Sequence, residues 1–261
     1  MPGIDAMEEN LRHMLGAFGR AQAAGETRAF PGLAVCSSAL NFAMFNGAVL
    51  TAPVETEAGL EQRIQTAAAY YGSRGLPWSI WVCEGWLERR LRPRTADSFY
   101  RSGLHLVVEL PGMEAALLEP PVRPLPALEF RRVGDPGTRS AFNHIMAIAF
   151  GIPFAFSRQI YESERTWGGG LTGWVAYREG TAVATAAMLI AGGVIGVYAV
   201  GTLPQHQRKG CGEAVMRHAL ERAQAESGLE CSVLQASAAG FHLYQRMGYR
   251  TITRYAVFAY S

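Results

Sequence analysis

Lysine is almost missing from this 261-residue sequence, because Lys209 is the only lysine among its 24 lysine and arginine residues. Acidic residues number 22, and the resulting net charge of +2 gives little reason to expect nucleic acid as a partner. The sequence has no run of ~18 or more apolar residues, so we expect no membrane partner. Its first sixteen residues lack the basic start and apolar core of a secretion signal.

Cysteine is scarce as well. Cys36, Cys83, Cys211 and Cys231 show no Cys-x-x-Cys spacing, which predicts reduced thiols in the cytoplasm and no metal site. Charged residues make up only 18% of the chain and hydrophobic residues 49%, a balance typical of a well-packed globular protein. The length exceeds the common size of one domain, so we expect one large or two smaller domains.

One stretch, from 194 to 220, carries the strongest local pattern. Residues 194–200 form an apolar, β-branched run that predicts a buried strand, and Pro204 ends it because proline cannot continue a central hydrogen-bond ladder. The loop 207–212 follows. Helical spacing then begins, with these apolar residues on one face: Val215, Met216, Ala219, Leu220 and Ala223.

A strand, a glycine-containing loop and a helix in this order form an anion site. The first N–H groups of the helix have no partner within the helix, and the helix dipole favours negative charge there. Gly210 and Gly212 remove side chains where a phosphate must approach the backbone closely. The single lysine, Lys209, lies in the same loop, and a compact ammonium beside a pyrophosphate is physically reasonable. Chance placement of this lysine is the alternative.

Two motifs give the second half of the chain its resemblance to a known family. The first is Gln207-x-x-Gly210-x-Gly212 after Pro204, and the second is the run from Leu243 to Tyr249, which resembles a Leu-Tyr-x-x-x-Gly-Phe signature. Between them there is room for one helix and one strand, at 231–236. Over about residues 128–261 the sequence resembles the GNAT superfamily of acyl-CoA-dependent N-acetyltransferases.

This resemblance implies an α/β fold with a mixed sheet, in which a central strand splays from its neighbour to admit the pantetheine arm. It also implies acetyl-CoA as co-substrate, with backbone groups near two positions of the central strand bonding the arm. The cofactor-binding residues that we expect are Val200, Thr202, Gln207, Arg208, Lys209, Gly210, Cys211, Gly212 and Tyr244. For Cys211, a place between the loop glycines favours a small-residue role over that of a nucleophile.

The first half of the chain shows a related order of elements without the loop. Helical periodicity covers 6–24 and 56–71, while strand patterns occur at 33–36, 42–45, 78–83 and 104–110, with a turn at Asn46-Gly47. This order resembles half of a GNAT domain, which implies a tandem protein whose first half does not bind CoA. An unrelated α/β domain is the alternative.

We therefore expect three segments: a degenerate GNAT-like domain at 1–117, a proline-rich linker at 118–127 and a catalytic domain at 128–261. Four prolines between Leu118 and Ala127 exclude both a helix and a central strand there. Because the linker is short, the two halves should dock, giving a monomeric pseudo-dimer or a homodimer.

The resemblance assigns Tyr244 as the general acid toward the departing thiolate, since a phenol can donate a hydrogen bond to sulfur at neutral pH. Packing of the last helix is its alternative role. Residues 194–202 carry no carboxylate, although many relatives place a glutamate base there. The remaining base candidates, none of them favoured, are Glu162, Glu164, His144, His206 and His242, besides a water held by carbonyl groups.

The function implied is transfer of an acetyl group from acetyl-CoA to a primary amine of a small molecule or peptide, directly in a ternary complex. The aromatic-rich stretch 142–156 suggests an apolar wall of the acceptor pocket. Two alternatives stay open: a non-catalytic acyl-CoA-binding or sensing protein, and an aminoacyl- or peptide-transferring tandem GNAT enzyme.

Overall fold

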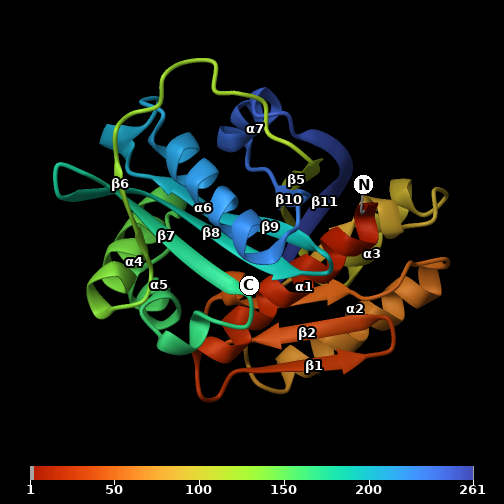
Figure 1. Cartoon of the computed structure of the whole chain (residues 1–261). Helices are drawn as coiled ribbons and strands as arrows, with labels where there is room; N and C mark the ends of the chain where they lie inside the picture. The colour runs from red at the N-terminus through yellow and green to blue at the C-terminus, as the bar shows by residue number, and fades with distance from the viewer. Residues whose placement is uncertain (1–2, 261) are drawn as a thin grey trace.

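The computed structural model describes residues 3–260, and within this range the strands form one continuous eleven-stranded sheet (Figure 1). Their order across the sheet is β1-β2-β3-β4-β11-β5-β10-β9-β8-β7-β6. The strands are β1 (Glu26–Phe30), β2 (Leu33–Ser37), β3 (Asn46–Leu50), β4 (Trp78–Cys83), β5 (His105–Ala115), β6 (Glu129–Arg132), β7 (Leu171–Arg178), β8 (Thr181–Ala191), β9 (Val194–Thr202), β10 (Ser232–Gln235) and β11 (Arg250–Tyr260). The α-helices are α1 (Gly3–Ala21), α2 (Glu57–Gly72), α3 (Thr95–Arg101), α4 (Pro136–Phe150), α5 (Phe154–Tyr161), α6 (Cys211–Ser227) and α7 (Ala238–Arg246).

The sheet has an internal two-fold pattern centred on the antiparallel pair β11 and β5. Outward on one side lie β4, β3, β2 and β1, and on the other side β10, β9, β8 and β7. The pair β3–β4 is parallel, as is β9–β10, whereas the pairs farther out are antiparallel. Along the chain the order β3-α2-β4-α3-β5 repeats as β9-α6-β10-α7-β11. From β1 to β5 the first part thus repeats the strand order of the second part from β7 to β11, but it has no counterpart of β6 and has the single helix α1 in place of α4 and α5.

Each half gives its last strand to the other half. The strand β5 pairs with β10 from Ala115↔Ser232 to Gly112↔Gln235, while β11 pairs with β4 from Tyr255↔Cys83 to Tyr260↔Trp78. The two halves therefore share one ladder of backbone hydrogen bonds. Neither half completes its own sheet without the other.

Helices cover both faces of this sheet. One apolar cluster packs α1, α4 and α5 against one face. On the other face, a second cluster packs α6 and α7 against the sheet, and a third packs α2 and α3. In Figure 1, α6 lies against β8 and β9, and α1 runs beneath the same strands. Asn10 of α1 fixes this second contact, because its amide donates to the carbonyl oxygens of Leu189 (3.0 Å) and Ala191 (2.9 Å) at the β8–β9 turn.

Residues 116–128 contain no helix or strand, and they arch from β5 to β6 above α6 and α7 (Figure 1). Among the helices of residues 3–260, none combines the length and the apolar character needed to cross a lipid bilayer.

In the first half, the structure contradicts one expected strand and one expected turn, and it contains a strand that was not expected. The segment 42–45 is not a strand, since a 3-10 turn covers Ala43–Phe45 and β3 begins at Asn46, where the turn was expected. The strand β1 was not predicted, because its side chains are largely exposed and its sequence shows no apolar pattern.

Candidate active site

The parallel strands β9 and β10 separate soon after they begin. They pair only at Ile195↔Ser232 and Gly196↔Val233, although β9 continues to Thr202. Ala236, just past β10, donates instead to the Pro111 carbonyl of β5 (2.8 Å). The sheet is therefore open between β9 and the end of β10, as the resemblance implied.

A β-bulge lies where β9 departs. The register with β8 shifts between Thr185↔Gly201 and Ala187↔Tyr198, and Ala199 inside the shift has a left-handed φ of 50°. The Thr185 hydroxyl donates to the Ala199 carbonyl (2.9 Å) and holds this conformation. A non-glycine residue at such a φ costs about 1–3 kcal/mol, so the surrounding structure must enforce it.

The loop after β9 presents a bare helix N-terminus to this opening. Arg208 has φ 59° and Gly210 has φ 80°, and no side chain caps the first turn of α6. A Cβ on Gly212 would stand 2.9 Å from the Thr202 hydroxyl oxygen, so a larger residue there would disturb the strand end. Free N–H groups, a glycine cradle and a helix dipole together fit the pyrophosphate of CoA.

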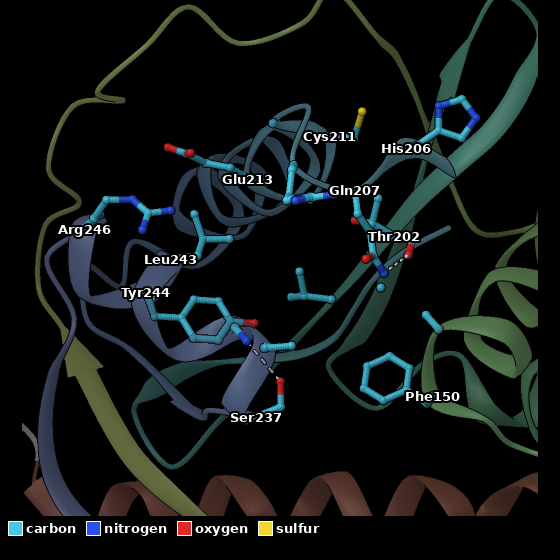
Figure 2. A pocket seen from close by; sticks show the side chains of 18 of the residues that line it. Phe150, Thr202, His206, Gln207, Cys211, Glu213, Ser237, Leu243, Tyr244 and Arg246 are labelled. Atoms are coloured by element: carbon cyan, nitrogen blue, oxygen red, sulfur yellow. Dashed lines mark hydrogen bonds between the residues drawn. The ribbon is translucent and has the colours of Figure 1, made fainter. Parts of the chain in front are cut away.

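These elements surround one cavity of about 480 Å3 (Figure 2). Eight of the nine residues predicted to bind the cofactor line it, and they are Val200, Thr202, Gln207, Arg208, Gly210, Cys211, Gly212 and Tyr244. Lys209 does not line the cavity, because its ammonium turns back to the Gln205 carbonyl (2.8 Å). The only lysine of the chain thus caps its own loop.

Tyr244 projects from α7 into the cavity (Figure 2). Its ring covers Gly240, where a Cβ would stand 2.7 Å from the ring. Burial raises the pKa of the Tyr244 hydroxyl to about 12, so the phenol keeps its proton at neutral pH. Within the described residues this hydroxyl makes no hydrogen bond, which leaves it free to donate to a ligand atom.

Of the five side chains considered as bases, His206 alone lines the cavity. Its Nδ1 is buried without a hydrogen-bond partner among residues 3–260. Glu162 and Glu164 accept from Asn143 and Arg139, whose side chains hold the α4–α5 corner. His144 and His242 are exposed and lie outside the cavity lining.

Other lining residues were missed in the sequence. The side chains of Phe150 at the end of α4, Ser237 before α7 and Arg246 at the end of α7 surround the opening (Figure 2). Val122 and Arg123 come from the proline-rich segment, which the sequence presented only as a spacer. No local motif marks such positions, because only the folded chain brings them to the loop.

Comparison with known proteins agrees with this geometry. Residues 169–251 match the family model described as acetyltransferase (GNAT) domain. A GCN5-related N-acetyltransferase from Kribbella flavida has a TM-score of 0.73 and 22% identity, with 98% of this chain and 95% of that chain covered. Another from Sphaerobacter thermophilus has a TM-score of 0.56 and 16% identity, with coverage of 98% and 93%. Among curated proteins there is no match.

A tandem GNAT protein from the clavulanic acid biosynthesis pathway also shares the fold, with a TM-score of 0.54, 11% identity and coverage of 87% of this chain and 77% of that chain. The fold class is therefore an α/β GNAT fold in tandem arrangement, as expected. Residues 169–251 match the model of a GNAT acetyltransferase domain, and the whole chain shares the GNAT fold with these solved structures.

Proposed function

We propose that this protein transfers an acetyl group from acetyl-CoA to the primary amine of a small molecule, directly in a ternary complex. One observation carries the proposal: the uncapped N-terminus of α6 faces the gap between β9 and β10 in one cavity with Tyr244. This combination offers an anion cradle, a slot between strands and a proton donor in a single place.

The chain's own groups have separable tasks in this proposal. Backbone N–H groups of the loop 207–212 and the first turn of α6 bind the pyrophosphate. The bulge at Ala199 turns the backbone of Val200 away from β8, so that its polar groups are available to the pantetheine arm. Acetyl-CoA, when bound, supplies the activated thioester.

Tyr244 holds the proton that the departing sulfur needs. Its pKa, raised to about 12 by burial, keeps the phenol protonated throughout the physiological range. A hydrogen bond from this hydroxyl to the sulfur stabilises the negative charge as the thiolate leaves. Phe150 and Ala149 at the end of α4 line the other side of the opening, where an acceptor with an apolar body would pack.

A non-catalytic acyl-CoA-binding protein is the second candidate, and one observation favours it. Glu213 is the sole carboxylate residue among the described residues that line the cavity, and it is paired with Arg217 (2.8 Å). An amine would then lose its proton to water or to His206 rather than to a carboxylate base.

Thiol release from acetyl-CoA across a panel of primary amines separates the two candidates. We expect amine-dependent release of CoA with at least one small apolar amine. CoA binding without release for any amine or peptide acceptor would favour the sensing protein. Release only with an aminoacyl donor or a peptide-like acceptor would instead indicate an aminoacyl- or peptide-transferring enzyme.

The cofactor loop has its own test, the replacement of Gly210 by leucine. Gly210 has a left-handed φ, and its missing Cβ would stand 3.1 Å from Pro126, so leucine should distort the loop and abolish stabilisation by CoA. Gly228→Leu is the matched control: it has φ 71° at the other end of α6, with no atom within 4 Å of the added Cβ. A full CoA-dependent rise in Tm for the Gly210 variant would refute the assignment.

A further inference from the structure

The segment between the two halves lies against both ends of the proposed cofactor cavity. At one end the Glu119 amide donates to the Met247 carbonyl just after α7 (2.9 Å). At the other end Pro126 packs on the loop, since its Cδ lies 3.1 Å from where a Cβ of Gly210 would stand. Figure 1 shows the chain between these contacts arching over α6 and α7. We call residues 118–127 the strap.

Two residues of the strap line the cavity itself. They are Val122 and Arg123, both exposed. The Arg123 guanidinium donates from Nη2 to the Arg208 carbonyl (3.2 Å), which places it beside the loop. A guanidinium has five N–H donors in a fixed fork, so this contact leaves most of them available.

The charge around this cavity is one-sided. Arginine side chains from three separate parts of the chain line it, namely Arg123 of the strap, Arg208 of the loop and Arg246 of α7. Glu213, which lines the same cavity, is already paired with Arg217. The unpaired charge at the rim is therefore positive, as a ligand with several phosphates requires.

We propose that the strap is part of the cofactor site and that Arg123 binds the 3′-phosphate of CoA. This inference rests on the proposed function. The backbone N–H groups of the loop serve the pyrophosphate, whereas Arg123 reaches the cavity from the strap and is exposed at its mouth. In this proposal the adenosine end, which follows the pyrophosphate in CoA, leaves the cavity at the mouth where the exposed Arg123 guanidinium lies. The strap thus makes the protein select CoA over dephospho-CoA, which lacks the 3′-phosphate.

Isothermal titration of the full chain with CoA and with dephospho-CoA tests this assignment. The native protein should bind CoA about tenfold more tightly, the effect of one charge-assisted contact with a phosphate. Arg123→Ala should bind dephospho-CoA with unchanged Kd but lose the preference for CoA. Arg123→Lys should keep part of the preference, because it keeps the charge without the fork. Arg89→Ala, which removes an exposed arginine away from the cavity, should leave both Kd values unchanged.

Three outcomes would overturn the assignment. An equal Kd of the native protein for the two ligands would show that no residue reads the 3′-phosphate. Equal weakening of both ligands in Arg123→Ala would place the guanidinium on another part of CoA. An unchanged preference in that variant would assign the 3′-phosphate to a different residue. Failure of the native protein to bind either ligand would instead refute the proposed function, and this inference with it.

Discussion

Glu8 has an unusual environment for a charged residue. It lies on α1 with 1% of its surface exposed, and neither carboxyl oxygen makes a hydrogen bond of normal geometry with residues 3–260. Burial raises the pKa of Glu8 to about 7, while the nearby Tyr255 hydroxyl and Cys83 thiol lower it by less. The folded protein therefore prefers this carboxyl in its neutral form.

This shift predicts how stability depends on pH. Because the pKa of Glu8 is higher in the folded state than in the unfolded chain, the folded state holds the extra proton between pH ~4.5 and 7. The contribution of this proton to the free energy of unfolding is complete below this window. It is lost, by about 3 kcal/mol, as the pH rises through the window. In urea unfolding, Glu8→Gln should lack this fall, whereas Glu9→Gln, at the exposed neighbour, should retain it. The same pH profile in Glu8→Gln and the native protein would contradict the buried proton.

Tyr244 is the residue whose replacement we expect to slow the reaction. If its hydroxyl donates to the departing sulfur, Tyr244→Phe should lower kcat by roughly ten- to ten-thousand-fold, with little change in the Kd for CoA. Steady-state kinetics and titration calorimetry measure the two quantities separately. Tyr260→Phe, at an exposed tyrosine outside the cavity, is the control. Full activity of Tyr244→Phe would leave the residue with a packing role only.

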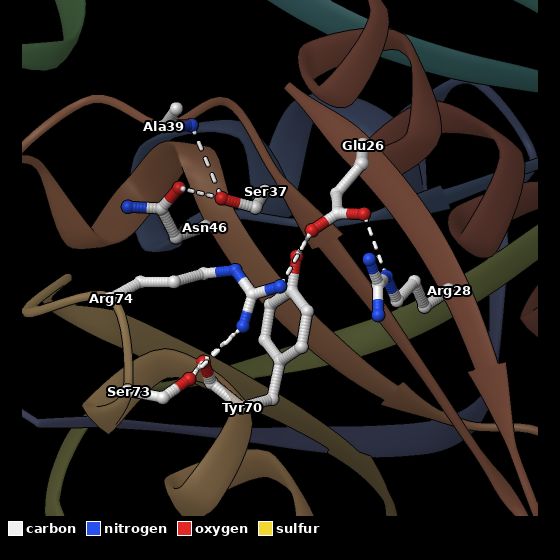
Figure 3. Close-up of polar contacts among 8 residues, drawn as sticks. All are labelled: Glu26, Arg28, Ser37, Ala39, Asn46, Tyr70, Ser73 and Arg74. Atoms are coloured by element: carbon white, nitrogen blue, oxygen red, sulfur yellow. Dashed lines mark hydrogen bonds and ion pairs between the residues drawn. The ribbon is translucent and has the colours of Figure 1, made fainter. Parts of the chain in front are cut away.

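Asn46 shows why a local sequence signal can mislead. Asn-Gly predicts a tight turn, yet Asn46 begins β3, and its side chain accepts from the Ser37 hydroxyl (3.2 Å) and donates to the Leu40 carbonyl (2.7 Å). Figure 3 shows this contact beside Ser37, whose hydroxyl also accepts from the Ala39 amide. The Asn46 side chain thus provides hydrogen-bond partners for polar groups of the loop that precedes β3. The same side chain also donates to the Pro77 carbonyl (2.9 Å), and a partner so distant along the chain is what distinguishes this role from a turn.

Among elements, those with strong local patterns were predictable. The strand β9, the loop after it and α6 follow from apolar runs, proline and glycine, and most of the candidate site lies on them. For β5, the sequence pattern predicted only the first part of the strand, to residue 110. A proline at 111 suggests an end, but the strand continues to Ala115: the Pro111 carbonyl accepts from Ala236, and Pro111 stays in register with Arg254 of β11. A single sequence does not predict which strands of the two halves pair with each other, as β5 does with β10 and β11 with β4.

A second polar group connects elements of the first half (Figure 3). Glu26 of β1 accepts from Arg28 (2.6 Å), from the Tyr70 hydroxyl of α2 (2.9 Å) and from Arg74 (3.0 Å). The Arg74 guanidinium also lies 4.0 Å from the centre of the Tyr70 ring. These contacts attach the edge strand to the helix behind it and account for a strand that has little apolar pattern of its own.

The exchange of β5 and β11 predicts how fragments behave. Residues 128–261 alone would leave β10 without β5, and β11 without both of its neighbours, so unpaired strand edges and apolar surface would be exposed. We expect this fragment to aggregate when expressed alone. Co-expression with residues 1–117 should restore a soluble complex, since the missing strands return. A monomeric fragment 128–261 with a cooperative unfolding transition would contradict the shared sheet.

At the scale of the whole molecule, the two-fold pattern relates α2 to α6, but the N-termini of these two helices differ. The N-cap residue of α6 is Gly210, which offers no side-chain cap, whereas the N-cap residue of its counterpart α2 is Thr56, whose hydroxyl accepts from the Gly59 amide (3.1 Å). Arg63 of α2 also donates to the carbonyls of Ala52 (2.7 Å) and Pro53 (3.0 Å) in the loop before this helix. In the first half, one amide of the first helical turn and two carbonyls of the preceding loop therefore already have side-chain partners.

This asymmetry predicts one CoA per chain. The first half has the strand–helix order of the fold, but its helix N-terminus is capped from within and no glycine lies between β3 and α2. Isothermal titration of the native protein should give a stoichiometry of one. Gly210→Leu should give no measurable binding, because we expect the loop of the second half to be the only phosphate cradle within residues 3–260. A stoichiometry of two, or retention of one bound CoA by that variant, would mean that the first half binds the cofactor by a different surface.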